Sequence, residues 1–568
     1  MRSTVFSRKD FRTNHHLKNE NSFFCHSNSG LRAVLAVPHQ DDEILTACAM
    51  LRYLVMSGAE VSVIYTTRGD MKYPEKTRRR EALRSLSLFG IEEKNIYFLG
   101  YDDSYFSMDH SHIFYNRDIS SRYLDDLIKL LGRLSPDFII CTDFDEHPDH
   151  RMLTLYLDRA VGILHGEDPE FSPVVWKRFA YSLAYKAVSD FSAVNNPETR
   201  RPVAGKTGKY HWDFIDRFIY SWDQRIRIPV PEDFRDRDIS RNFVSKALMM
   251  HRSQNIIVNA AGIINSDEVY WERRSDNLVS KSQITVSSGN SVPLSGYGLF
   301  EAEDIDSVIP VFSDFCWKPE DDDPEKKARF TWDKPVFVNR IVLYGALSEG
   351  SRIGRLSVTL NDGYEKIIDG LPSNAAPVVI IPDKNREIKY CELRILEYEG
   401  NDYGIIRCEI FKDAVPCRVV RPFCKLTIND NFVYDHFIDE NQRECAIGIY
   451  TYGETGSISL SVIKGNASLR DSILVMDKEE KEAVIRGENA DGSVYDQITV
   501  RRMDTKTSKA IQRAEISNRW FLMRKRQVQI IHNMSYILRH EGLISFGKRV
   551  VLFYIDKLRE VFHDSDRK

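Results

Sequence analysis

The sequence predicts an α/β protein, in which a parallel sheet with helices on both faces is followed by β-sandwich domains and a C-terminal helical tail. Strand-like and helix-like patterns alternate over residues 31–165, whereas short alternating strand patterns dominate 281–412 and 413–503. Helical patterns return from residue 504. At 568 residues the chain is too long for one ordinary domain, and its 42% hydrophobic and 29% charged residues are typical of a globular protein.

The first predicted domain covers residues 31–280 and follows a polar N-terminal arm, residues 1–30, which we expect to be disordered or loosely packed. The domain contains three apolar runs of strand length, Leu31–Val37, Val61–Thr67 and Phe138–Thr142. Amphipathic stretches of helical spacing lie between them at 42–57, 75–90 and 118–134. Because parallel strands need crossover connections, this alternation predicts a Rossmann-like parallel sheet.

The remainder of this domain is less regular. Residues 166–230 mix tryptophan, tyrosine and phenylalanine with charged residues, so we interpret them as an insertion plus further strands near a substrate mouth. Residues 233–253 are interpreted as a helix that leads out of the domain.

Two short clusters of metal-binding residue types each follow an apolar run. They are Pro38-His39-Gln40-Asp41-Asp42-Glu43 and His147-Pro148-Asp149-His150. His39 and Asp42, like His147 and His150, are three positions apart, which places both side chains on one side of a turn. One such cluster alone is typical of a surface turn or a helix cap. Two clusters at the ends of two strands indicate a metal site, because ligands of α/β sheets gather there.

The residue types fit hydrolytic zinc chemistry. Two histidines and two aspartates can supply three metal ligands and leave one carboxylate uncoordinated. A hydrolytic zinc centre needs this set, together with an open position for water and a general base. Asp41 lies between His39 and Asp42 and can point toward such a water.

These motifs resemble those of the LmbE/PIG-L-like family of zinc-dependent de-N-acetylases, over roughly residues 31–280. The family signature is a His-x-Asp-Asp-Glu segment after the first strand and a later His-Pro-Asp-His segment. The resemblance implies Zn²⁺ as the cofactor, with Fe²⁺ able to accept the same ligands. It also implies an N-acetylated sugar of the N-acetylglucosamine type as the substrate.

The resemblance assigns a role to each matching residue. The implied metal ligands are His39, Asp42 and His150. The implied catalytic residues are Asp41 as general base, His147 as the oxyanion-stabilising group and Asp149 as the group that orients His147. The implied substrate-binding residues are Arg78, which begins Arg78-Arg79-Arg80-Glu81, and Asp103. The chain departs from the family pattern at Gln40, where proline is usual, and at Asp145, where some members have tyrosine.

Residues 281–412 resemble a discoidin-like (coagulation-factor C-type) β-sandwich in the segments Ala328–Trp332, Val338–Tyr344 and Ile405–Phe411. Domains of that kind often bind carbohydrate, and a structural spacer fits the sequence equally well. The strand patterns of residues 413–503 predict a further small β domain, in which we identify no chemistry.

The last predicted segment, residues 504–568, is a basic amphipathic helical tail. Residues 501–568 contain 16 Lys or Arg and 7 Asp or Glu among apolar side chains. Such a helix can lie on an anionic membrane surface, or it can pack on the protein or on a partner. Nucleic acid is not an expected partner, because the net charge is −4 and no nucleic-acid motif is present.

We therefore expect a metal-dependent hydrolase that removes the acetyl group from an N-acetylated sugar in cell-envelope or surface-glycan biosynthesis. Because no apolar run approaches the ~20 residues that span a bilayer and Met1–Phe6 has no apolar signal core, the expected location is cytoplasmic, or peripheral at the membrane. Two alternatives stay open, namely a non-catalytic glycan-binding or scaffold protein with a dormant hydrolase domain, and an amidase acting on a non-sugar amide.

Overall fold

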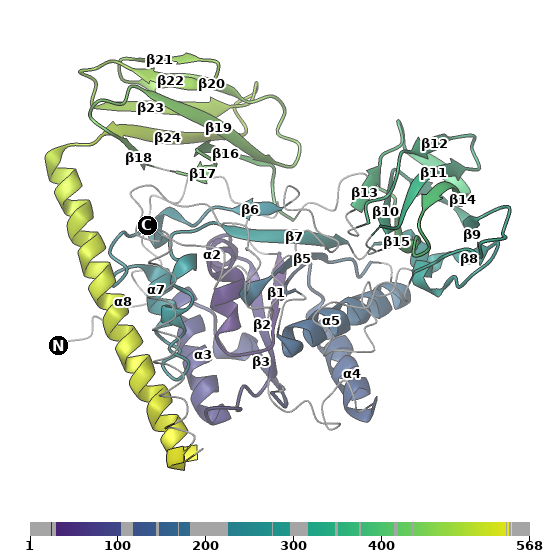
Figure 1. Ribbon diagram of the computed structural model, residues 1–568, viewed down its shortest axis with the longest axis horizontal. Coiled ribbons are helices and arrows are strands. Elements are labelled where there is room, and N and C mark those ends of the chain that lie inside the picture. Colours follow the sequence, from purple (N-terminus) through teal and green to yellow (C-terminus); the bar gives the residue numbers. More distant parts are fainter. Residues whose placement is uncertain are drawn as a thin grey trace.

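The computed structural model describes Phe24 and residues 30–103, 117–143, 147–168, 170–181, 225–274, 276–295, 316–346, 350–373, 377–413, 419–433, 435–540, 542–544 and 547. Figure 1 shows an α/β domain, two β-rich units and a long C-terminal helix that runs along one side of the molecule. Asp145, most of the predicted insertion (182–224) and the end of the tail (548–568) lie outside the described residues.

A mixed sheet forms the centre of the α/β domain. Its strands are β1 Arg32–Val37, β2 Glu60–Thr67, β3 Ile96–Tyr101, β4 Phe138–Thr142, β5 Val174–Arg178, β6 Ile226–Ile228 and β7 Glu268–Arg274. Their order is β3-β2-β1-β4-β5-β7-β6, in which neighbours among β1 to β5 are parallel and β7 is antiparallel to both β5 and β6. The predicted α/β domain with parallel strands is therefore confirmed.

Helices cover both faces of this sheet (Figure 1). The helices are α2 Asp42–Met56, α3 Glu75–Phe89, α4 Arg117–Leu134, α5 Pro148–Glu167 and α7 Phe243–Leu248. Leu35 and Val37 of β1 share a core with α2, α3 and α7, whereas Val34 and Ala36 share the opposite core with α4 and α5. Successive side chains of a strand point to opposite faces, so β1 is buried on both sides.

The predicted helix over residues 233–253 is wrong in length. The structure has a 3₁₀ turn at Glu232–Phe234 and an α-helix only at Phe243–Leu248, after which the chain returns to the sheet as β7. Between the two, Asp238 Oδ1 accepts a hydrogen bond from the Ser240 backbone N–H, and the Asn242 side chain accepts one from Ser245. Side-chain acceptors of this kind compete with helical hydrogen bonds, so the helix begins only at Phe243, with Asn242 as its N-cap.

Two antiparallel sheets follow and share one apolar core. Five strands, β8 Gln283–Val286, β9 Lys327–Val338, β11 Arg352–Leu360, β12 Glu365–Ile368 and β14 Arg386–Glu399, form the larger sheet. The smaller sheet has β10 Arg340–Gly345, β13 Pro377–Ile380 and β15 Ile405–Phe411. Both sheets contribute to the core, for example through Phe330 and Leu343. The predicted antiparallel strands are confirmed, and the discoidin-like resemblance stays a prediction.

The second β-rich unit also consists of two sheets around a common core. One sheet has β16 Phe423–Ile428, β17 Asn431–Phe432, β19 Glu444–Tyr452, β21 Ala467–Arg470 and β22 Ile473–Met476. The other has β18 Asp435–Ile438, β20 Ser459–Lys464, β23 Glu482–Glu488 and β24 Tyr495–Arg502. Leu426 and Leu474 of the first sheet pack with Ile485 and Ile498 of the second.

This unit contacts the α/β domain through polar and aromatic groups. The Arg227 guanidinium of β6 lies 4.0 Å from the Phe432 ring centroid and donates to the Asp430 carbonyl at 2.7 Å. Phe24, from the predicted loose arm, is fully buried in the core of the α/β domain and forms a β-bridge with Val420. At this residue the chain is packed, against the expectation for residues 1–30.

Helix α8, Thr505–His540, confirms the predicted helical tail (Figure 1). Short 3₁₀ turns lie at Glu93–Asn95, Ile256–Val258, Ala261–Ile263, Leu278–Lys281 and Val292–Ser295. Within the described ranges, none of the helices combines the length and the apolar character that crossing a bilayer requires.

Candidate metal centre

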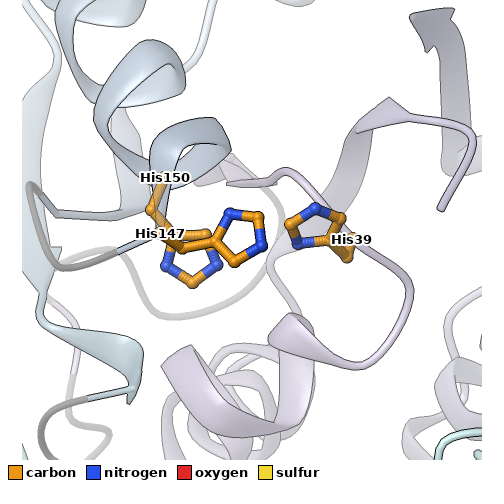
Figure 2. Close-up of side chains that lie close together, drawn as sticks. All are labelled: His39, His147 and His150. Carbon is orange, nitrogen blue, oxygen red and sulfur yellow. The ribbon is translucent and has the colours of Figure 1, made fainter. Parts of the chain in front are cut away.

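The two predicted clusters meet at the C-terminal edge of the central sheet. His39 follows β1 and His147 and His150 begin α5 after β4, and these two strands are parallel neighbours. Figure 2 shows the three imidazoles side by side. Their ring centroids lie 4.6 Å apart for His39 and His147, 5.1 Å for His147 and His150, and 5.7 Å for His39 and His150. One nitrogen of each ring lies within 4.8 Å of the others.

The Asp42 carboxylate lies between two of these rings. Its Oδ2 is 2.9 Å from His39 Nδ1 and 3.2 Å from His150 Nε2, and it also accepts the His39 backbone N–H at 3.0 Å. Asp42 is fully buried, and its Oδ1 has no hydrogen-bond partner among the described residues. Buried polar atoms are normally satisfied. A buried carboxylate between two imidazole nitrogens therefore fits a divalent cation that prefers nitrogen and oxygen ligands.

Asp149 and Asp103 approach the other side of His39. His39 Nε2 is 3.0 Å from Asp149 Oδ2 and 3.6 Å from Asp103 Oδ1. The Asp149 carboxylate is 3.8 Å from His147 Nδ1, which instead accepts the Asp149 backbone N–H at 3.2 Å. In this structure Asp149 thus orients His147 through its backbone, while its carboxylate faces His39.

Asp41 points to the guanidinium of Arg78. Its Oδ1 accepts a hydrogen bond from Arg78 Nη2 at 3.2 Å. The same guanidinium donates to the carbonyl of Gln40 at 2.9 Å and to that of Gly69 at 3.1 Å. Arg78 is buried, so in this structure it supports the loop after β1 from α3. Its predicted contact with substrate stays a prediction.

Burial and neighbouring charges together set the pKa values of Asp41 and Asp42, the two aspartates after β1. Burial raises the pKa of Asp41 to about 6, against the opposing charge of Arg78. Burial alone would also raise the pKa of Asp42, but His150 and His39 outweigh this effect and hold that pKa well below its usual range. Asp42 is therefore an anion beside two imidazoles.

The pKa values of His147 and His39 shift in opposite directions. Burial lowers the pKa of His147 to about 3, and the nearby His39 adds to this effect. Burial would also lower the pKa of His39, but the carboxylates of Asp103, Asp149 and Asp42 outweigh it and raise that pKa well above its usual range. A cation bound here would take the place of the extra proton that these carboxylates favour on His39.

Residues outside the predicted set join the helices that carry the site, α2 and α3, to the turn after α7. Glu43 and His251 are both fully buried, with Glu43 Oε1 2.6 Å from His251 Nε2. Glu81 accepts hydrogen bonds from the backbone N–H and the hydroxyl of Ser253, at 2.9 and 2.6 Å. Glu43 and Glu81 each end a segment that resembles the family motifs, but the sequence does not indicate which residues they contact.

Tyr181 is a further contact that the sequence did not indicate. Its ring centroid lies 4.5 Å from that of His150 and 5.5 Å from that of His147. A single tyrosine within an aromatic-rich stretch has no spacing that distinguishes it from core residues.

The family comparison agrees with this geometry. Residues 34–161 match the family model of the GlcNAc-PI de-N-acetylases, PIG-L. This range includes both clusters, so the predicted resemblance to the PIG-L-like de-N-acetylases is confirmed over these residues. No curated protein matches the chain significantly.

Several solved structures are similar to part of the chain. The N,N'-diacetylchitobiose deacetylase from Pyrococcus horikoshii is 16% identical with a TM-score of 0.27, over 48% of this chain and 96% of that one. A deacetylase of teicoplanin biosynthesis is 16% identical with a TM-score of 0.30, over 43% of this chain and 99% of that one. The 4-carboxy-2-hydroxymuconate hydratase from Pseudomonas putida is 18% identical with a TM-score of 0.20, over 26% of this chain and 65% of that one. The functional proposal below rests on the family match and on the site.

Proposed function

We propose that this chain is a metal-dependent hydrolase that removes the acetyl group from an N-acetylated sugar of the N-acetylglucosamine type. The observation that carries the proposal is the contact of the buried Asp42 carboxylate with both His39 and His150, at 2.9 and 3.2 Å, inside the stretch that matches the de-N-acetylases. In this proposal the site belongs to a Rossmann-like domain of residues 31–280, which is followed by two β-rich domains at 281–412 and 413–503.

The proposed metal is Zn²⁺, and Fe²⁺ would accept the same ligands. Bound by His39, Asp42 and His150, it would supply a Lewis acid and lower the pKa of an attacking water toward ~7. Asp41 would stay outside this ligand set, because its Oδ1 accepts a hydrogen bond from Arg78.

The remaining steps belong to side chains of the protein. Asp41 accepts the proton of the attacking water as the water adds to the acetamide carbonyl. His147 Nδ1 accepts the Asp149 N–H, so its neutral ring carries the proton on Nε2 and can donate a hydrogen bond to the developing oxyanion. One such donor is typically worth about 3 kcal/mol in the transition state. The proton held by Asp41 then passes to the leaving nitrogen as the C–N bond breaks, so acetate leaves and the product keeps a free amine.

The substrate-binding residues are proposed from the same site. Asp103 lies at its edge, 3.6 Å from His39, where its carboxylate can accept hydrogen bonds from sugar hydroxyls. Arg78 is the second proposed substrate-binding residue, which would hold sugar hydroxyls or a phosphate. Carbohydrate binding by the discoidin-like unit and a role in envelope or surface-glycan synthesis extend this proposal.

The first test is Asp41→Asn, with metal analysis and acetate release measured on the same preparation. The variant should keep its metal and lose turnover by about 10²–10⁴-fold, as removal of a general base does. Asp70→Asn, in the loop after β2, is the matched control and should keep both. Full activity in Asp41→Asn would reject Asp41 as the base.

A substrate panel separates the alternatives. Nucleotide-linked and lipid-linked N-acetyl sugars should release acetate, and His150→Ala should lose metal and activity together. Release from non-sugar amides alone would remove the carbohydrate assignment and favour an amidase. Protein prepared without chelators that contains no metal and releases no acetate would favour the dormant scaffold.

A further inference from the structure

Helix α8 is attached to the α/β domain by one face. Ile511 and Asn518 are buried, and Phe521 and Leu522 pack against the core that contains α2, α3 and α7. Asn518 Oδ1 accepts the Ile239 N–H at 3.0 Å, and its Nδ2 donates to the Arg237 carbonyl at 2.6 Å. This face accounts for only part of the apolar side chains of α8.

The opposite face of α8 carries a second row of apolar residues, which we call the outer stripe. Its members recur at intervals that keep them on one side of an α-helix: Ile516, Trp520, Met523, Ile531 and Leu538. All five are exposed, Trp520 by 57% and Ile531 by 66%. At 100° per residue the outer stripe is centred about opposite to Asn518. An apolar row that is turned away from the protein marks an interaction surface.

Positive charge borders the outer stripe on both sides. The helix has eight Lys or Arg residues and one glutamate. Arg513 and Arg524 lie along one border, and Arg519 and Arg526 along the other, all exposed. Two copies of this helix facing each other would place arginine beside arginine, which disfavours pairing. The charge is complementary to an anionic surface.

We propose that the outer stripe of α8 binds the surface of an anionic lipid bilayer. Exposed Trp, Ile, Leu and Met side chains between two rows of arginine match the lipid-facing side of a helix that lies in the membrane interface, while the second apolar row of α8 packs on the α/β domain. In Figure 1, α8 runs along the outside of the molecule, which leaves its outer side accessible to a flat surface. The inner face keeps the rest of the protein attached to the lipid-bound helix.

The attachment also places the metal centre relative to this surface. Near the C-terminal end of α8, His532 Nε2 lies 3.0 Å from the Tyr73 hydroxyl, and Asn533 Oδ1 accepts from Lys72 Nζ at 2.9 Å. Lys72 and Tyr73 belong to the same loop as Gly69, whose carbonyl Arg78 binds beside Asp41. A lipid-bound α8 would hold the rim of the candidate site near the bilayer.

Vesicle co-sedimentation of the full chain tests the proposal without reference to catalysis. The protein should sediment with vesicles of phosphatidylcholine mixed with phosphatidylglycerol, and much less with phosphatidylcholine alone. Trp520→Glu combined with Ile531→Glu should abolish sedimentation. Changing any one of the four border arginines to glutamine should lower binding to the anionic vesicles about five-fold. Added salt should also weaken this binding.

The matched control carries the same charges at equally exposed apolar positions elsewhere. Ile381→Glu combined with Ile463→Glu, on the two β-rich units, should leave vesicle binding unchanged. Unchanged thermal unfolding of both double variants shows that each is folded. Wild type that stays in the supernatant, or a stripe variant that binds as wild type does, overturns the proposal. A concentration-dependent dimer that Trp520→Glu dissociates would also overturn it, in favour of a second copy of the chain.

Discussion

The position of Asp41 depends on a set of hydrogen bonds between the loops that follow β1 and β2. Arg78 holds the Gln40 and Gly69 carbonyls, and Gln40 Nε2 donates to the Thr67 carbonyl at 2.8 Å. Gly69 has φ +60°, and a Cβ there would lie 2.2 Å from Gln40 Oε1. A side chain at position 69 would therefore displace the Gln40 amide and adopt a backbone conformation that favours glycine.

Gly69→Ala should lower both the stability and the activity of the protein. The new methyl group must displace the buried Gln40 amide, and loss of its hydrogen bond costs ~0.5–1.5 kcal/mol beyond the cost of alanine at positive φ. Gly58→Ala is the matched control, because Gly58 has φ +79° and open space around its Cβ position. Urea unfolding and acetate release should both show Gly69→Ala to be the more damaging change. Equal effects of the two substitutions would contradict the steric argument.

The sequence predicted part of the candidate site for a clear physical reason. His39, Asp42, His147 and His150 recur at turn spacing after two apolar runs, and those runs became adjacent parallel strands. The partner that each group faces was not predictable, because it depends on side-chain directions. The carboxylate of Asp149 faces His39 although the chain places it next to His147.

At the scale of elements, buried polar pairs fix α2 and α3 against the turn that follows α7. Glu43 on α2 contacts His251, and Glu81 on α3 accepts two hydrogen bonds from Ser253. Burial and the charge of Glu43 act in opposite directions on the His251 imidazole, and the carboxylate prevails, so the pKa of His251 is raised. Each side chain of this buried pair therefore depends on the other to offset the cost of its burial.

His251→Ala should destabilise the protein by about 3–5 kcal/mol, because it leaves the Glu43 carboxylate buried without its cation. Adding Glu43→Gln should recover a large part of this loss, since the stranded charge is then gone. Arg79→Ala, which removes an exposed ion pair with Glu75, should cost less than ~1 kcal/mol. Urea unfolding followed by tryptophan fluorescence would measure these changes in the free energy of unfolding. A double variant no more stable than His251→Ala would show that charge is not the cause.

Helix α8 offers a second prediction at this scale. Asn518→Ala removes two hydrogen bonds to residues 237 and 239, worth roughly 1 kcal/mol each. Amide hydrogen exchange in α8 should therefore become about 10–30-fold faster if the helix opens by detaching from the α/β domain. Gln527→Ala, on the exposed side, is the control and should leave exchange unchanged. Unaltered exchange in Asn518→Ala would mean that apolar packing alone holds α8.

At the scale of the whole molecule, local patterns predicted the elements better than their arrangement. The apolar runs that became β1, β2 and β4 are continuous because both faces of these strands are buried, which is a strong local signal. The antiparallel place of β7 between β6 and β5 depends on partners that are 40 to 44 and 94 to 100 residues away. The long helix predicted over 233–253 was wrong because short side-chain contacts interrupt it. The domain boundaries stay a proposal.

The interface between the α/β domain and the first β-rich unit contains an ionisable group that should make stability depend on pH. Glu272 of β7 lines a cavity of about 320 Å³ together with Arg340, Tyr344 and Glu409 of that unit. Burial raises the pKa of Glu272 from its ordinary 4.5 to about 7, against the opposing charge of Arg274. The folded protein therefore holds this proton more tightly than the unfolded chain does.

Because the folded protein holds this proton more tightly, its stability falls as the pH rises. The protonated side chain contributes its full stability below pH 4.5, and the contribution is lost as the pH rises from 4.5 to about 7. Glu272→Gln, which stays neutral, should therefore be more stable than wild type at pH 8 by about 2–3 kcal/mol and no different at pH 4. Urea unfolding at the two pH values measures this, with the exposed Glu365→Gln as a control that should match wild type at both. A Glu272→Gln variant less stable than wild type at pH 8 would show that the carboxylate is charged in the folded protein, held by the neighbouring arginines across the interface.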